Sequence, residues 1–502
     1  MQQLRKAKTG INGLDEITLG GLPQGRPTLV CGGPGCCKTL FSMEFLVKGA
    51  TLFNEPGVFM AFEEKAEELA VNVVSLGFDL AKLQKQKKLV LDFVRIERSE
   101  IEETGDYDLD GLFIRLEHAI KTIGAKRVVL DTIENLFAGL TNQGILRAEL
   151  RRLFLWLKEK GVTAIITGEQ GDGKLTRHGL EEYVSDCVIL LDHRVINQIS
   201  TRRLRIVKYR GSVHGTNEYP FLIDEEGFSV LPVTSLTLER PVSSQRISTG
   251  IPSLDEMFGG KGFYRGSSIL VSGTAGTGKS SIAAYFANAV CQRKEKCIYF
   301  AFEESQNQII RNMRSIGLNL DLHVKSGLLQ FHSSRPSLYG LERHLANIYK
   351  MIKAVKPAAV ILDPVTNLVS VGLINEVNSM LLRLVDFLQN EGITVMLTAL
   401  TSILDERMDE GVSSLVDTWI SVRDIEVNGE RNRTLYIMKS RGMKHSNKVR
   451  EFVISPKGLD LIEVYRGEGG NIIIGSEREM MEKQKNSGNK QAKTRNKKVS
   501  GK

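Results

Sequence analysis

An eight-residue stretch in the second half of the chain has the residue types and spacing needed to hold phosphate groups. Gly273-Thr-Ala-Gly-Thr-Gly-Lys-Ser280 matches the pattern GxxxxGK followed by Ser or Thr, in which backbone N–H groups surround the phosphates. In this pattern Lys279 neutralises the β- and γ-phosphates, and the Ser280 hydroxyl helps to hold a magnesium ion. The stretch therefore predicts a nucleotide site with ATP and Mg²⁺ as its ligands.

Carboxylates that end two other apolar runs could complete this site. Asp363 follows Ala-Ala-Val-Ile-Leu and has the position of the acid that organises the metal. Glu303 and Glu304 end another run, where one carboxylate could orient or deprotonate the nucleophile that attacks the γ-phosphate while the other fixes the metal. Adjacent carboxylates on a solvated turn are also common, so the pair alone leaves both readings open.

The chain contains the same landmarks twice, in the same order. Thr9-Gly-Ile-Asn-Gly-Leu-Asp-Glu16 returns as Thr249-Gly-Ile-Pro-Ser-Leu-Asp-Glu256, at an offset of 240 residues. Four further pairs follow: Gly32-Gly-Pro-Gly-Cys-Cys-Lys-Thr39 with Gly273 to Ser280, Ala61-Phe-Glu-Glu64 with Ala301-Phe-Glu-Glu304, Val129-Leu-Asp131 with Ile361-Leu-Asp363, and Lys208-Tyr-Arg-Gly211 with Lys439-Ser-Arg-Gly442. A period this long indicates two tandem domains of one fold. We place the domains at 1–240 and 241–475, followed by a tail at 476–502.

Short apolar runs alternate with longer amphipathic stretches in each copy, which predicts an α/β fold with mostly parallel central sheets. The strands expected in the first copy are 27–32, 58–62, 127–130 and 162–168, with a helix at 145–160. Those expected in the second copy are 268–272, 297–302, 358–362 and 393–400, with a helix at 377–390. Ligands of such sheets bind beyond the carboxyl ends of the strands, where the glycine-rich loops and the carboxylates fall.

The first copy departs from the phosphate-loop pattern because Cys37 replaces the glycine before the lysine. A side chain there would strain the loop, by about 1 kcal/mol, if the position needs a glycine conformation. Cys36 and Cys37 would also begin a helix, where thiol pKa values fall, so we expect redox sensitivity. A tolerated substitution without chemistry is the alternative.

Charge and composition exclude several classes of protein. The net charge is +8, but residues 476–502 hold nine Lys and Arg against three Asp and Glu, so the rest of the chain is nearly neutral. This argues against nucleic-acid binding and predicts a disordered, basic C-terminal tail. No apolar run is long enough to span a membrane and the start lacks a signal peptide, so we expect a cytoplasmic protein. The six cysteines show neither a disulfide pattern nor zinc-ligand spacing.

The duplicated phosphate-loop domains, the Glu-Glu pairs and the repeated Lys-x-Arg-Gly…His segments together resemble the KaiC family, a group of RecA-like ATPases and autokinases. Glu181-Glu-Tyr-Val-Ser-Asp186 is similar to the first domain of that family, and Val449-Arg-Glu-Phe-Val-Ile454 to the second. The resemblance implies a homohexamer with ATP at the subunit interfaces and a KaiB-like or other signalling protein as partner. It also implies autophosphorylation at residues four and three positions before Asp417, which are Ser413 and Ser414.

The residues expected to act follow from the motifs and the resemblance together. The catalytic residues are Glu63, Glu64, Glu303 and Glu304, and the metal site uses Thr39, Asp131, Ser280, Glu303 and Asp363. The nucleotide contacts in the first copy are Gly35, Cys36, Cys37, Lys38, Thr39, Leu40, Ser75, Lys208, Arg210 and His214. Those in the second copy are Ala275, Gly276, Thr277, Gly278, Lys279, Ser280, Ser281, Arg433, Lys439, Arg441 and His445.

Two other classes of function stay open at this point. The same fold drives DNA recombinases and helicases, although a basic stripe with interleaved aromatic residues is not evident. A nucleotide-gated scaffold without kinase activity would assemble with ATP and hydrolyse almost none.

Overall fold

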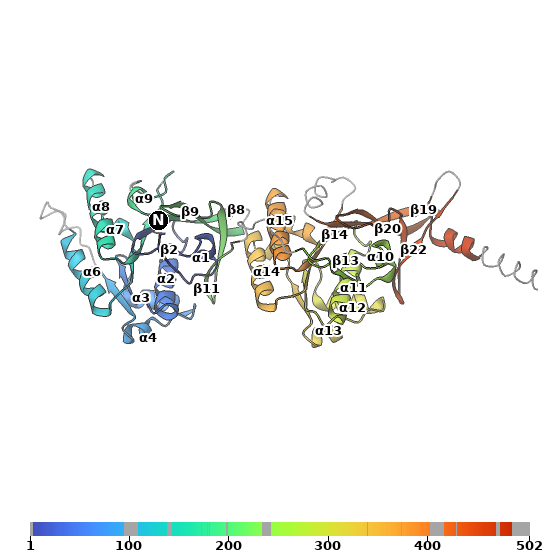
Figure 1. The fold of residues 1–502 in the computed structure, drawn as a ribbon, viewed down its shortest axis with the longest axis horizontal. Helices are drawn as coiled ribbons and strands as arrows, with labels where there is room; N and C mark the ends of the chain where they lie inside the picture. The colour runs from blue at the N-terminus through green and yellow to red at the C-terminus, as the bar shows by residue number, and fades with distance from the viewer. Residues whose placement is uncertain are drawn as a thin grey trace, which may run out of the picture. The chain divides into compact units, whose positions relative to one another are not determined.

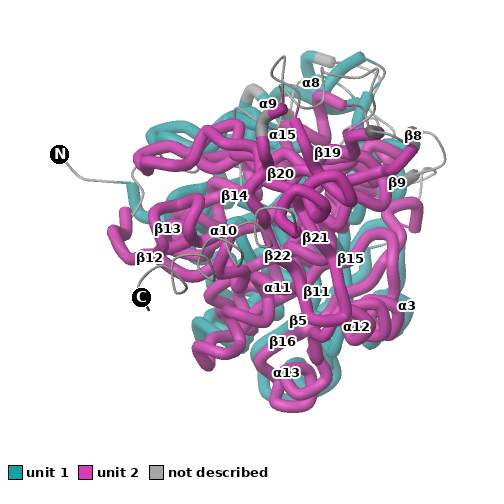
Figure 2. The backbone as a smooth tube through the Cα atoms, turned by 90° about the vertical axis from the view of Figure 1, so that its right-hand side faces the viewer, with its two compact units in different colours: residues 1–235 teal, residues 236–502 magenta. Residues whose placement is uncertain are grey.

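The computed structural model consists of two compact units, residues 1–235 and 236–502 (Figure 2). Each unit has a central sheet and a hydrophobic core of its own. The structure describes residues 4–94, 109–137, 143–171, 173–177, 179, 181–196, 199–232, 242–338, 340–372, 374–401, 416–427, 429–467 and 472–483.

A twisted sheet forms the centre of the first unit (Figure 1). Among the described residues its strand order is β11-β10-β9-β8-β3-β7-β6-β4-β5. The strands that run parallel to one another are β3 (Pro27–Gly32), β4 (Gly57–Ala61), β5 (Leu89–Phe93), β6 (Arg127–Asp131), β7 (Thr163–Glu169) and β8 (Cys187–Ile196). The sheet continues with three antiparallel pairings through β9 (Ile199–Tyr209), β10 (Glu218–Asp224) and β11 (Gly227–Val230).

Helices cover both faces of this sheet, because its central parallel strands are buried along their whole length and are mostly apolar. One core lies against α2 (Lys38–Leu52) and includes residues of α1 (Leu14–Ile17), α3 (Ala66–Val74) and α4 (Leu80–Lys85). The other core lies against α6 (Asp110–Ile123), α7 (Ile133–Leu136) and α8 (Gln143–Glu159). The short α9 (Glu181–Val184) leads into β8, and β1 (Lys6–Ala7) pairs with β2 (Leu22–Pro23).

The second unit repeats this architecture, with strand order β16-β15-β17-β18-β14-β19-β20-β21-β22 among its described residues. Its strands are β14 (Ser268–Gly273), β15 (Cys297–Ala301), β16 (Leu329–Ser333), β17 (Ala359–Asp363), β18 (Thr394–Leu400), β19 (Thr418–Val427), β20 (Glu430–Ser440), β21 (Arg450–Ser455) and β22 (Gly458–Glu463). Its helices are α10 (Pro252–Met257), α11 (Lys279–Gln292), α12 (Gln306–Ser315), α13 (Asp321–Lys325), α14 (Leu341–Val355) and α15 (Ile374–Asn390), with 3₁₀ turns at Pro336–Leu338 and Val365–Val371. Two small pairings, β12 (Arg246–Ile247) with β13 (Phe263–Tyr264) and β23 (Tyr465–Arg466) with β24 (Ile472–Ile473), complete it.

The α/β fold with two mostly parallel sheets is confirmed. The predicted central strands lie within one or two residues of the observed ones, because continuous apolar runs are the mark of strands buried on both faces. The antiparallel extension of each sheet was not predicted. Its strands mix buried residues with partly exposed ones and carry many charges, so their apolar runs are too short to identify them as strands.

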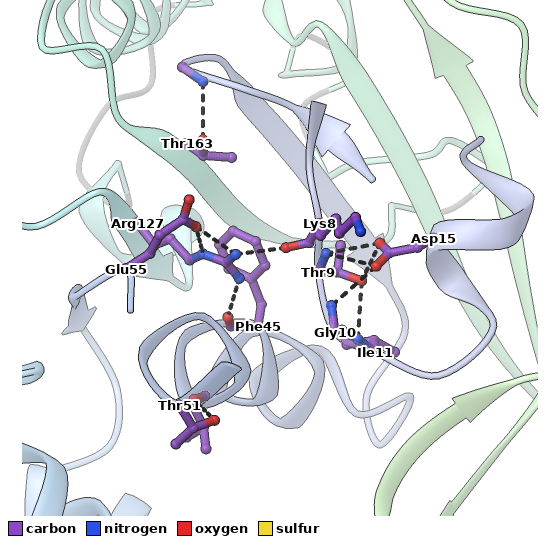
Figure 3. A network of polar contacts seen from close by, with 12 residues as sticks. Lys8, Thr9, Gly10, Ile11, Asp15, Phe45, Thr51, Glu55, Arg127 and Thr163 are labelled. Carbon is purple, nitrogen blue, oxygen red and sulfur yellow. Dashed lines mark hydrogen bonds and ion pairs between the residues drawn. The ribbon is translucent and has the colours of Figure 1, made fainter. Parts of the chain in front are cut away.

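The repeated Thr-Gly-Ile…Leu-Asp-Glu motif has a structural role. In the first unit the Asp15 carboxylate accepts hydrogen bonds from the Thr9 N–H at 2.9 Å, the Thr9 hydroxyl at 2.7 Å and the Gly10 N–H at 3.3 Å (Figure 3). In the second unit the Asp255 carboxylate accepts one from the Thr249 N–H at 2.8 Å. The spacing shared by the two copies therefore fixes the turn that enters each domain.

The first part of the segment predicted as a tail is a helix that contacts the second unit. Residues 475–483 are helical, and the Arg478 guanidinium is buried against the Glu451 carboxylate at 2.6 Å. The Gly475 N–H also donates to Glu451, at 3.2 Å. A buried ion pair thus attaches residues 476–483 to the second unit. Residues 484–502 lie outside the described part.

Candidate functional site

The glycine-rich loop of the second unit lies between β14 and α11, at the carboxyl edge of the sheet. Gly278 precedes α11 with φ +97°, a left-handed conformation that glycine adopts without strain. Lys279 is buried, and its ammonium donates to the Thr274 carbonyl at 2.7 Å. The Thr277 hydroxyl donates to the same carbonyl at 2.9 Å. The Thr277 and Lys279 side chains therefore both bind the backbone of the loop itself.

A cavity of about 340 Å³ opens beside this loop and brings together residues from four strand ends. Glu303 and Glu304 follow β15, Asp363 ends β17, and Leu400 ends β18. The lining residues from the loop and α11 are Ala275, Gly276, Gly278, Lys279, Ser280 and Ser281. Most of the nucleotide, metal and catalytic residues predicted for the second copy thus share one cavity.

The side chains around this cavity hold its charges in place. The buried Asp363 carboxylate accepts hydrogen bonds from the Tyr299 and Thr398 hydroxyls. Burial lowers the pKa of the Lys279 ammonium, and the Asp363, Glu303 and Asp424 carboxylates oppose that shift. The Asn312 amide donates to Glu304 at 3.3 Å, which fixes this carboxylate against α12. Ser280, Glu303 and Asp363 offer the oxygen ligands that Mg²⁺ prefers, so the residues present fit that ion.

The first unit forms a similar arrangement around β3 and α2. The Lys38 ammonium donates to the Gly32 carbonyl at 2.8 Å and to the Gly33 carbonyl at 3.1 Å. Asp131, at the end of β6, accepts a hydrogen bond from the Thr167 hydroxyl, and burial raises its pKa, opposed by hydrogen bonds from Thr167 and Thr39. Lysine, hydroxyl and carboxylate are therefore gathered in this unit as well.

The Glu-Glu pair of the first unit is more firmly held than its counterpart. The Glu63 carboxylate accepts from the Thr132 hydroxyl at 2.9 Å and from the Asn135 amide at 2.7 Å. The Asn72 amide donates to Glu64 at 3.2 Å, as Asn312 does to Glu304. Pro364, which has no hydroxyl, occupies the place of Thr132 in the second unit.

Cys37 adopts the left-handed conformation that favours glycine, with φ +73° and ψ 35°. The position is therefore strained, as its sequence pattern predicts. The expectation of a lowered thiol pKa is wrong. Burial raises the pKa of both Cys36 and Cys37 and outweighs the opposing Lys38 charge, and Cys36 belongs to the hydrophobic core. Desolvation disfavours the thiolate more than the helix start favours it.

The Lys-x-Arg-Gly…His segments lie at the opposite edge of each sheet from the phosphate loop. Lys208 pairs with Val188 of β8, which is level with Leu29, three residues or ~10 Å before the loop begins. The Arg210 N–H donates to the Asp186 carbonyl at 2.8 Å, further in the same direction, and His214 follows. The second unit repeats this placement, with Lys439 paired to Trp419, Arg441 bonded to Asp417, and His445 after them. These residues are therefore distant from the phosphate loop of their own unit.

The remaining predicted residues fall in several places. Arg433, on β20, donates to the Gly276 carbonyl of the loop at 3.3 Å. Leu40 packs against the first core, and Ser75 is exposed at the end of α3. Gly35 lies at the exposed tip of the first loop, with φ +71°. Ser413 and Ser414 lie outside the described residues.

Sequence reasoning missed several residues that complete the two sites. They are Asn72 and Asn312, which hold Glu64 and Glu304; Thr167 and Thr398, which hold Asp131 and Asp363; and Arg202, the counterpart of Arg433. Each recurs at nearly the same offset in the two copies, and that recurrence was the available signal. Among the residues that the structure covers, no helix is long and apolar enough to cross a membrane.

Two units of this kind, each with a phosphate loop after a central parallel strand and carboxylates at the neighbouring strand ends, define a tandem RecA-like P-loop ATPase. The family model of the KaiC ATPase matches this chain twice, at residues 7–235 and 247–466. The chain belongs to the KaiC family.

Curated relatives support this assignment over most of their length. The circadian clock protein KaiC2 of Synechocystis sp. (strain ATCC 27184 / PCC 6803 / Kazusa) is 58% identical over 479 residues, which cover 95% of this chain and 84% of that protein. The circadian clock oscillator protein KaiC of Synechococcus elongatus is 37% identical over 473 residues, which cover 93% of this chain and 90% of that protein.

Proposed function

We propose that this protein is a magnesium-dependent ATPase that assembles as a homohexamer and phosphorylates Ser413 and Ser414 of its own second domain. The observation that carries the proposal is the cavity where Lys279, Ser280, Glu303, Glu304 and Asp363 meet. This set of groups can neutralise phosphate charge, hold a metal ion and accept a proton, which are the parts that phosphoryl transfer needs.

Each group has a role that follows from its position. Lys279 would leave the Thr274 carbonyl to bind phosphate oxygens, since a triphosphate is the stronger acceptor. Glu303 and Glu304 would orient and deprotonate the attacking water or serine hydroxyl. Ser280, Asp363 and Glu303 would hold Mg²⁺, which neutralises charge on the phosphates when bound.

The two edges of each sheet support ATP sites that are completed by a neighbouring subunit. The phosphate loop lies at one edge, and Lys208, Arg210 and His214 lie at the other, with Lys439, Arg441 and His445 in the second domain. Head-to-tail contacts between copies would bring these basic residues of one subunit to the nucleotide of the next, as arginine fingers do in trans. In the proposed hexamer such contacts would close into a ring.

The two domains differ where phosphorylation is proposed. The first domain has Glu182 four residues before Asp186, and its carboxylate accepts a hydrogen bond from the Thr176 hydroxyl at 2.5 Å. The second domain has Ser413 at the matching position before Asp417. A phosphate of charge about −1.5 to −2 on that serine would resemble the carboxylate of the first domain and repack the segment around it. This change of charge would make the protein a reversible clock or signalling switch.

Mass spectrometry after incubation with ATP and Mg²⁺ tests the proposal. The tryptic fragment Met408 to Arg423 contains both serines. Phosphate on Ser413 or Ser414 is expected in the native chain and is expected to be lost in Lys279→Ala. ATP turnover with an unmodified fragment would refute the autokinase, and phosphate at the normal level in Lys279→Ala would refute the assigned site.

Assembly and partners are tested separately. Size-exclusion chromatography with light scattering should show a hexamer with ATP and a smaller species without it. Arg441→Ala leaves Lys279 and the rest of the phosphate loop unaltered, and we expect it to reduce ATP turnover in the second domain. The names of the relatives favour a clock role. We further propose a cytoplasmic location and a KaiB-like partner, and co-purification from the native host would identify that partner.

A further inference from the structure

The phosphate loop of the second domain is in contact with a carboxylate that the motif does not include. Asp424 lies on β19, and the Thr274 hydroxyl of the loop donates to its Oδ2 at 3.3 Å. The Arg431 guanidinium of β20 donates to the same oxygen at 2.6 Å. The Asp424 side chain is 14% exposed and that of Arg431 61%, so the carboxylate lies mostly buried beside the loop and its partner lies at the surface.

This carboxylate acts on the charge of the nucleotide site. Asp424 is one of three carboxylates whose charges oppose the effect of burial on the Lys279 ammonium. Its direct partner across the β19–β20 hairpin is Arg433, which donates to the Gly276 carbonyl at 3.3 Å. The hairpin thus touches the loop at two residues, Thr274 and Gly276. An unpaired Asp424 would repel bound phosphates, and Arg431 neutralises that charge.

The first domain has no such pair at the same place. His193 corresponds to Asp424, since His193 lies directly opposite Arg202 and Asp424 directly opposite Arg433 in the matching hairpins. Ser200 corresponds to Arg431, and it contacts His193 Nε2 at 2.7 Å. A contact between a histidine and a serine therefore replaces the ion pair. The two nucleotide sites of the chain therefore differ in the residues at these two hairpin positions.

We propose that Arg431 preserves the nucleotide affinity of the second domain by neutralising the Asp424 carboxylate beside the phosphate loop. Asp424 is a positioning residue that holds Thr274, and Arg431 removes the repulsion that its carboxylate would exert on the phosphates. The inference rests on the proposed function, because it concerns ATP at that site. It predicts that removal of the arginine alone weakens binding and that replacement of both residues by the first domain's pair restores it.

The test uses the full chain with the first site disabled by Lys38→Ala. Titration with a methylanthraniloyl derivative of ATP and Mg²⁺ then reports the second site. Arg431→Ser should weaken binding by about three- to tenfold, as one uncompensated charge near the phosphates would, and added salt should reduce the defect. Asp424→His with Arg431→Ser should bind within about twofold of the parent.

A matched control and a second variant keep the inference open to refutation. Arg423→Ser removes an arginine of the same hairpin that stacks on Tyr436, 5.2 Å from the ring centre, and should change affinity less than twofold. Asp424→Asn keeps an oxygen that can accept from Thr274 and should bind ATP as well as the parent or more tightly. Unchanged affinity in a folded Arg431→Ser, or weaker binding in Asp424→Asn, would overturn the inference.

The first domain offers the reverse experiment. In a Lys279→Ala background His193→Asp should weaken the first site, and addition of Ser200→Arg should restore it. If the Lys38→Ala parent fails to bind nucleotide, or Lys38→Ala with Lys279→Ala still binds it, the proposed function itself fails. If those controls behave as expected and Arg431→Ser has no effect, only the role of the ion pair fails.

Discussion

Arg127 lies at the start of β6 and is 1% exposed, although its side chain is charged (Figure 3). Its guanidinium donates to Glu55 at 2.7 Å, to the Phe45 carbonyl at 2.7 Å and to the Lys8 carbonyl at 2.6 Å. It also packs over the Phe45 ring, 4.4 Å from the ring centre. One side chain therefore joins α2, the segment after β1 and the loop after α2. Arg127→Ala removes all of these contacts.

The cost follows from the groups left behind. Arg127→Ala leaves two carbonyls without their donor and the partly exposed Glu55 carboxylate without its charged partner, and it opens a space; together these changes cost about 3–5 kcal/mol. Gly49 of α2 faces the same side chain, because a Cβ there would lie 2.5 Å from Arg127 Cδ and Nε. Gly49→Ala should therefore destabilise the native chain by about 1–3 kcal/mol. In the Arg127→Ala background it should instead stabilise by about 1 kcal/mol, since alanine favours the helix.

Urea unfolding followed by fluorescence measures these changes. The chain has two tryptophans, Trp156 in the first unit and Trp419 in the second, so a Trp419→Phe background reports the first unit alone. Lys126→Ala, at the exposed neighbouring position, is the control and should change the free energy of unfolding by less than about 0.5 kcal/mol. If Gly49→Ala destabilises both backgrounds, or Arg127→Ala lowers the free energy of unfolding by less than about 1 kcal/mol, Arg127 does not stabilise the first unit in this way.

Three further predictions concern other buried groups. Burial raises the pKa of Glu44 from 4.5 to about 7, so native Glu44 keeps a proton that the unfolded chain loses as the pH rises. The free energy of unfolding should therefore fall by about 3 kcal/mol between pH 4.5 and 7. In urea titrations Glu44→Gln should flatten this dependence on pH. Gly278→Cys, which imitates the first loop, should weaken nucleotide binding at the second site because its Cβ would lie 2.8 Å from Ile454 Cδ1 and Phe452 Cε1. An affinity of the second site equal to that of the native chain would contradict this. Arg478→Met should release residues 475–483, seen as faster proteolysis there, because Glu451 loses its buried partner; an unchanged cleavage rate would count against it.

Local sequence patterns were enough to predict the central strands and the residues of the nucleotide sites. The two phosphate loops, the Glu-Glu pairs and the acids Asp131 and Asp363 each follow a short apolar run, and such runs identify buried parallel strands without knowledge of their neighbours. Parallel strands have their carboxyl ends at the same edge of a sheet, so the sequence alone predicted that these residues lie together in one site in each domain. The repeat then gave the number of domains.

The tertiary structure alone decided what depends on distant residues. The placement of Lys208 opposite the phosphate loop follows from the register of β8 and β9, which local patterning does not encode. The raised pKa of the Cys37 thiol and the burial of Arg127 depend on how completely other segments cover them. The contact between Asp424 and Thr274 joins residues 150 positions apart. Solvent exclusion and charge pairing are properties of the packed chain, so they exist only once strands far apart in sequence have come together.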